Sequence, residues 1–144
     1  MNFAMIASNT NRARAYLQNL IQYGFIPSKV IYLDVQNITL VEQLDEHKLA
    51  GSSTKQKSIV EAKEFNISFD QKKSILESLI EVNIPYEHLE TTDINSNLVQ
   101  HAIISLEEKA ILFAGPGGQI LDKKLLTLGK KIFHVHPGYL PKYR

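Results

Sequence analysis

Two short runs of apolar and β-branched residues constrain the fold of this chain more than any other feature. Lys29–Val35 reads KVIYLDV, and Lys109–Ala114 reads KAILFA. Neither run alternates between apolar and polar residues, and such continuous runs are typical of strands covered on both faces. Strands of this kind belong to parallel sheets, in which neighbouring strands are joined by long crossover connections. The chain is therefore expected to contain a parallel sheet.

Amphipathic segments lie between the apolar runs, as those crossovers require. Further strands are expected at Ala4–Ala7, Tyr86–Leu89 and Lys131–Val135. Helical spacing of apolar residues predicts four helices between or after these strands. The candidate capping residues of the first two are Asn9, Thr10 or Asn11, and Ser68 or Asp70. The third is capped by Asn95 or Ser96 and has Leu98 on its apolar face, and the fourth is capped by Asp122 and extends to Leu128. The alternation predicts an α/β fold, a Rossmann-like mostly parallel sheet with helices on both faces. Its 144 residues are enough for one domain, 1–144.

Two segments in the middle of the chain carry weaker signals. Thr39 and Glu42 have the spacing of a capping box and predict a short helix. His47–Ser58, which includes Gly-Ser-Ser-Thr, is the best candidate for a flexible connection.

Composition excludes several classes of protein. The chain has no cysteine, which excludes a disulfide framework, thiolate catalysis and cysteine-based zinc sites. No apolar run approaches the roughly 18 residues that a membrane span needs, and the start of the chain does not resemble a secretory signal. We therefore expect a cytoplasmic protein without a membrane partner. Residues 122–144 carry six basic side chains and one acidic one, which favours an anionic ligand or simply a solvated surface.

Ligands of parallel sheets bind beyond the carboxyl ends of the strands, which directs attention to the residues after Ala114 and after Val135. The first place is Gly-Pro-Gly-Gly-Gln, at 115–119. Glycines allow positive φ and let backbone N–H groups approach a ligand closely. The loop lacks the spacing of a Walker or a dinucleotide-binding motif. A tight turn from strand to helix is the alternative explanation.

The second place is His134-Val135-His136-Pro137-Gly138. In an extended strand, residues i and i+2 face the same side, so both imidazoles are expected to project together at the carboxyl edge of the sheet. An imidazole there can move a proton or polarise a carbonyl group. A metal site is a weaker interpretation because the other histidines form no recognisable ligand motif. Two packed or surface histidines are the remaining alternative.

The sequence around these histidines resembles a known family. Ile132–Arg144, IFHVHPGYLPKYR, is similar to the signature of the formyltransferases that use 10-formyltetrahydrofolate, in which a strand ends in Asn-x-His-Pro and is followed by Leu-Pro, an aromatic residue and Arg. Phe113–Leu121, FAGPGGQIL, resembles the folate-contacting loop of that family. The first similarity covers about 13 residues and the second nine; the rest of the chain agrees in its alternating α/β order.

The resemblance implies transfer of a formyl group from 10-formyltetrahydrofolate to a primary amine. His136 matches the catalytic histidine, which assists proton movement and stabilises the tetrahedral intermediate. His134 stands where the family usually has an asparagine that donates to the developing oxyanion, and an imidazole N–H can also donate there. The folate-binding residues implied by the resemblance are Gly117, Gly118, Gln119, Ile120 and Leu121.

The chain departs from the family pattern at its end. The family's catalytic aspartate lies a few dozen residues past the histidine, whereas this sequence stops at Arg144. We therefore expect a truncated N-terminal formyltransferase domain that is inactive by itself. The acceptors that the resemblance implies include initiator methionyl-tRNA, glycinamide ribonucleotide and nucleotide-linked amino sugars. We expect a small phosphorylated amine, with a nucleotide-linked amino sugar favoured. The alternatives are a catalytically inert folate- or nucleotide-binding module, and a metal-binding regulator built on His134 and His136.

Overall fold

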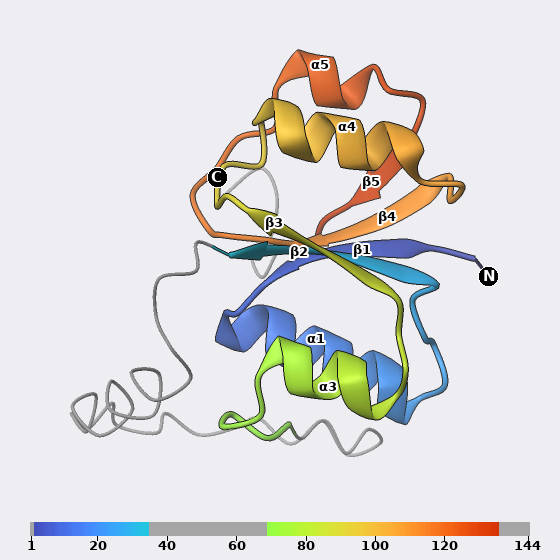
Figure 1. Cartoon of the computed structure of the whole chain (residues 1–144), viewed down its shortest axis with the longest axis vertical. Helices are drawn as coiled ribbons and strands as arrows, with labels where there is room; N and C mark the ends of the chain where they lie inside the picture. The colour runs from blue at the N-terminus through green and yellow to red at the C-terminus, as the bar shows by residue number, and fades with distance from the viewer. Residues whose placement is uncertain (1, 35–68, 136–144) are drawn as a thin grey trace. The chain divides into compact units, whose positions relative to one another are not determined.

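The computed structural model describes residues 2–34 and 69–135, and these contain a five-stranded parallel sheet (Figure 1). The strands are β1 (Ala4–Ser8), β2 (Lys29–Asp34), β3 (Tyr86–Glu90), β4 (Ala110–Ala114) and β5 (Lys131–Phe133). Their order in the sheet is β3-β2-β1-β4-β5, and each neighbouring pair is parallel. The Rossmann-like α/β fold expected from the sequence is confirmed.

Helices cover both faces of this sheet (Figure 1). Helices α1 (Asn11–Gln22) and α3 (Ile75–Glu81) lie on one face, and α4 (Asn97–Ser105) and α5 (Lys123–Leu126) lie on the other. Each face has its own cluster of buried apolar side chains. The central strand β1 is buried at all five positions, and the four inner residues of β2 are buried as well. Coverage of the sheet on both faces thus explains why the residues of β2 form a continuous apolar run.

Local polar residues determine where the helices begin. Thr10 caps α1, since its hydroxyl accepts from the backbone N–H of Ala13. Helix α3 begins after Ser74, which forms a capping box with Glu77, and not at Asp70 as the sequence suggested. The Asp70 carboxylate instead accepts from the backbone N–H of Lys72, in a turn before the helix. The other proposed cap, residue 68, lies outside the described residues.

Three further expectations are corrected at the edges of the fold. Leu98 is 54% exposed, because the buried stripe of α4 runs through Val99, Ala102 and Ile103. Strand β5 ends at Phe133, two residues earlier than predicted, and its two end residues are exposed. In the described part of the sheet β5 has a neighbour on one side only, so fewer contacts extend it. Helix α5 ends at Leu126, before the predicted Leu128.

The helix expected after Thr39, the connection His47–Ser58 and the residues from His136 onwards lie outside the described residues. Within 2–34 and 69–135, no helix is long and apolar enough to cross a membrane.

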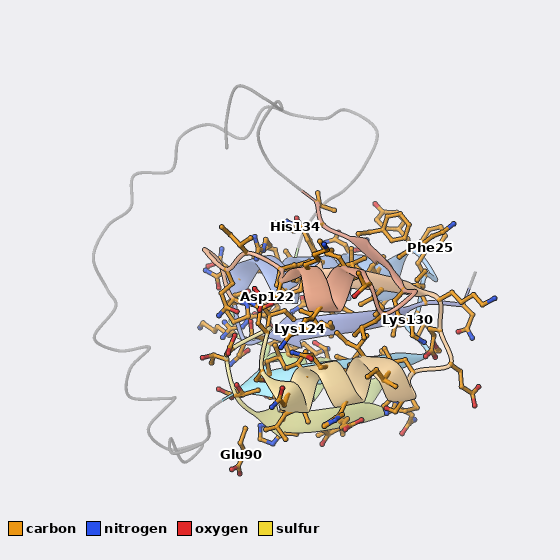
Figure 2. All side chains as sticks on the ribbon, turned by 90° about the horizontal axis from the view of Figure 1, so that it is seen from above. Phe25, Glu90, Asp122, Lys124, Lys130 and His134 are labelled. Atoms are coloured by element: carbon orange, nitrogen blue, oxygen red, sulfur yellow. The ribbon has the colours of Figure 1, made fainter. Side chains whose placement is uncertain are left out.

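The carboxyl ends of β1 and β4 lie side by side, because Ala7 pairs with Ala114 at the last position of their ladder. The strand order reverses between these two strands, and such reversals form crevices for ligands in open parallel sheets. Figure 2 shows Glu90 and His134 toward the same end of the sheet, and Phe25 and Lys130 toward the opposite end. The candidate site is therefore at the carboxyl ends of β1, β4 and β5.

Candidate functional site

Arg12, in the first turn of α1, connects the three strand ends of this site. Its Nη2 donates to the carbonyl oxygen of Gly115, just after β4, at 2.8 Å. Its Nη1 lies 3.4 Å from Nε2 of His134, just after β5. One guanidinium therefore connects the residues that follow β4 and β5 to the helix that follows β1.

The His134 ring is exposed, and it is also held by an aromatic neighbour. Its centroid lies 5.6 Å from that of Phe113, with an angle of 70° between the ring planes, an edge-to-face arrangement. Phe113 itself is only 4% exposed and belongs to the core between the sheet and α4. The next residue along the chain is held by α1 as well, since the Tyr16 hydroxyl donates to the Val135 carbonyl oxygen at 3.5 Å.

Two of the three glycines in the loop after β4 are required by the structure, each for a different reason. At Gly115 an added Cβ would lie 2.5 Å from Cε2 of Phe113, so a side chain there would collide with the ring. Gly118 has φ +78°, a conformation that residues with a side chain rarely adopt. Gly117 has neither constraint, and the space around its missing side chain is open. The backbone of Gly117 is exposed and accessible to a ligand. Neither packing nor backbone conformation requires a glycine at this position.

The structure gives the remaining predicted folate-binding residues other contacts. The Gln119 side chain donates to the Thr92 carbonyl oxygen at 2.7 Å and accepts from the Ile94 N–H at 2.8 Å, so its amide joins the loop to the segment before α4. Leu121 packs against the core beside α4. Ile120 is 85% exposed, an unusual position for a large apolar side chain next to an open backbone.

Two buried polar atoms at this edge have no hydrogen-bond partner among the described residues. One is Oγ of Ser8, the last residue of β1, which is 5% exposed. The other is Nε of Arg12. Buried polar groups are nearly always paired, so such atoms commonly mark a place where a water molecule or ligand completes the bonding.

A second polar cluster, beyond the ends of β1 and β2, has a structural role. Arg14 is 7% exposed, and its Nε donates to Oδ1 of Asn9 at 3.0 Å while Nη1 donates to the Gln71 carbonyl oxygen at 2.6 Å. Nearby, the Tyr32 hydroxyl donates to Asp34 at 2.9 Å. Burial, together with this carboxylate, raises the pKa of Tyr32 far above its ordinary value, so the phenol stays protonated. The Arg14 guanidinium thus fixes the loop before α3 against α1.

Lys130, one of the basic residues near the end of the chain, does not lie at this site. Lys130 lies at the opposite end of the sheet (Figure 2), where Nζ donates to the carbonyl oxygens of Leu106 and Glu108 and thereby caps the end of α4. For the part of the chain that the structure describes, no group of three His, Asp or Glu side chains is arranged to hold a metal ion.

The structure thus brings His134 and the start of the glycine loop together, through Arg12. Gln119 and Leu121 make packing and backbone contacts instead, and His136 lies outside the described residues. Sequence reasoning missed Arg12. The available signal was a pair of basic residues, Arg12 and Arg14, in the first turn of a helix, where the helix dipole disfavours positive charge. Comparison with models of protein families and with curated proteins finds no match to this chain.

The groups at this site can interact with a ligand in two ways. A guanidinium N–H and an imidazole can both stabilise negative charge that develops on an oxygen atom. The exposed backbone of the glycine loop can donate to a ligand beside them. A ligand with a reactive carbonyl group and a polar ring system would use both features.

Proposed function

We propose that this protein is a formyltransferase that moves a formyl group from 10-formyltetrahydrofolate to a primary amine. The observation that carries the proposal is the Arg12 guanidinium, bonded to Gly115 and in contact with His134 at the carboxyl end of the parallel sheet. This joins the two segments whose sequences resemble the formyltransferase signature and its folate-contacting loop. A cytoplasmic location is part of the proposal.

The loop after β4 has features that support binding of a folate. The open backbone at Gly117 and Gly118 offers hydrogen-bonding groups for a pteridine ring, and Ile120 is exposed next to it as an apolar contact. Ser8 Oγ and Arg12 Nε, for which the described residues supply no hydrogen-bond partner, are further polar groups at the same edge of the sheet. When bound, the folate supplies the formyl carbon.

In the proposed reaction the amine nitrogen forms a bond to the formyl carbon, and the bond from that carbon to N10 of the folate then breaks. The amine loses a proton to a base, and N10 gains one on departure. We assign the proton transfer to His136 by its resemblance to the family histidine. We assign stabilisation of the oxyanion of the tetrahedral intermediate to His134, where a preorganised donor is worth about 10²–10³ in rate, and the contact of its ring with Arg12 supports this assignment.

The test combines folate binding with transfer. Equilibrium dialysis with labelled 5-formyltetrahydrofolate, a stable analogue, measures binding to the chain of 144 residues. Mass spectrometry of amines incubated with 10-formyltetrahydrofolate and the full natural protein measures transfer. His136→Ala should lower transfer by about 10²-fold or more, the scale of a general acid–base group. His101→Ala, an exposed position on α4, is the matched control and should leave the rate unchanged.

The outcomes separate the candidate functions. Transfer to an amine supports the proposal, and a nucleotide-linked amino sugar is the first acceptor to try. Formylation of methionyl-tRNA in preference to sugars would assign the acceptor differently. Folate binding without transfer to any amine would favour an inert binding module. Failure of both folate binding and transfer would refute the proposed function.

A further inference from the structure

Arg12 holds the segment after β5 from an element far away in the sequence. Its guanidinium reaches the Gly115 carbonyl oxygen at 2.8 Å and His134 Nε2 at 3.4 Å. Tyr16, one helical turn later, reaches the Val135 carbonyl oxygen. Residues four apart lie on the same face of a helix, so this face of α1 contacts two consecutive residues of the segment.

The hydrogen-bonding chemistry of this contact determines where the imidazole carries its proton. A guanidinium has five N–H donors, no acceptor, and remains charged in proteins. His134 Nε2 can therefore bond to Arg12 only through its lone pair, which leaves the single ring proton on Nδ1. The edge-to-face contact with Phe113 restricts rotation of the ring, so the two nitrogens do not readily exchange places.

From this geometry we infer that Arg12 is a positioning residue that holds His134 in its neutral tautomer with the proton on Nδ1. The first attachment of the guanidinium, the buried carbonyl oxygen of Gly115, fixes the direction of the second. Nδ1 is then the ring nitrogen of His134 that carries the proton.

For catalysis this inference rests on the proposed function and refines it. The family asparagine donates from an amide that is always neutral, and an imidazole imitates it only in a fixed tautomer. Arg12 supplies that constraint, so Nδ1–H acts as the donor to the oxyanion.

The tautomer can be measured without any ligand. Two-bond ¹H–¹⁵N correlation spectra of the labelled protein at neutral pH distinguish a protonated ring nitrogen from one with a lone pair. The loss of signals in His134→Gln assigns the ring. In the unsubstituted protein we expect Nδ1 protonated and Nε2 unprotonated. A free imidazole side chain prefers the reverse, so a spectrum with Nε2–H, or with both nitrogens protonated, would overturn the inference directly.

Two variants then assign the effect to Arg12. Arg12→Met keeps the length of the stem but removes every donor, and should return His134 to the Nε2–H form. Tyr16→Phe removes only the hydroxyl that holds Val135 and should leave the tautomer unchanged. An unchanged tautomer in Arg12→Met, or a reversed one in Tyr16→Phe, would refute the role of Arg12. If Arg12→Met does not fold, the spectrum of the unsubstituted protein still decides.

Activity provides a second measurement that separates this inference from the proposed function. With formyl transfer established, Arg12→Met should lower kcat by about 10²-fold, the lower end for one oxyanion donor, with a smaller change in KM. A kcat within twofold of the unsubstituted enzyme would refute the catalytic part. If the unsubstituted protein transfers no formyl group, the proposed function fails, whereas the tautomer measurement stands or falls by itself.

Discussion

The glycine that follows β4 offers the most direct test of how tightly the candidate site is packed. In Gly115→Ala, the new methyl group would lie 2.5 Å from Cε2 and 2.9 Å from Cζ of the Phe113 ring. The ring is only 4% exposed and packs within the core, so it cannot move aside freely. Gly115 does not have a positive φ, so the collision is the main cost of the substitution.

Overpacking of this kind destabilises proteins by about 1–3 kcal/mol. At this chain length each kcal/mol corresponds to a shift of roughly 4 °C in Tm. Thermal and urea denaturation followed by circular dichroism would measure both quantities. Because the Phe113 ring also contacts His134, the imidazole signals of His134 should shift in the same variant.

Two glycines in the same loop serve as matched controls. Gly117→Ala has open space around the added Cβ and no positive φ, so its stability should change by less than about 0.5 kcal/mol, or rise through lower entropy of the unfolded chain. Gly118→Ala should cost about 1–2 kcal/mol from its left-handed backbone alone. If Gly115→Ala were as stable as Gly117→Ala, the close packing of Phe113 on the loop would be refuted.

Two other predictions concern the polar contacts that position the loop and the helices. Gln119→Ala should lower stability by about 1–3 kcal/mol, because the buried N–H of Ile94 loses its acceptor and the Thr92 carbonyl loses its donor; an unchanged urea midpoint would show that the contact is not structural. Backbone and side-chain hydrogen bonds with Ser74 lower the pKa of Glu77, so the stability from this capping box is complete above the ordinary value of 4.5 and is lost as the pH falls below it. Urea midpoints from neutral to acidic pH should decline less in Glu77→Gln, and identical pH profiles would contradict the assignment.

The central strands of the sheet could be predicted because their residues are compatible with few structures other than a buried parallel strand. Lys29–Asp34 and Ala110–Ala114 are too continuous in apolar residues for a solvated edge strand, and both became inner strands of a parallel sheet. The edges were harder to predict. Leu98 fits the apolar spacing of α4, yet it lies one position outside the buried stripe. Whether such a residue is covered depends on the neighbouring elements, about which helical spacing gives no information.

In the candidate site too, features set by neighbouring residues in the sequence could be predicted, whereas contacts between distant residues could not. The glycine loop and His134 were found because strand ends in parallel sheets adjoin ligands, and the sequences after those strands were unusual. Their connection through Arg12 joins residues 122 positions apart in the sequence. Alternation of strands and helices predicts a parallel sheet but not its strand order, and only the order β1-β4-β5 brings the start of α1 next to both loops.

Positive charge in the first turn of α1 was the one local sign in the sequence that Arg12 joins the two loops. A cation in the first turn of a helix opposes the helix dipole by about 0.3–1 kcal/mol. Arg12 and Arg14 both carry that cost, in a turn that contains no acidic residue to offset it. The bond to the Gly115 carbonyl, a charge-assisted hydrogen bond worth about 1.5–3 kcal/mol, exceeds the cost. The positive end of α1 and the guanidinium then both lie at the same edge of the sheet, where their positive charge favours an anion.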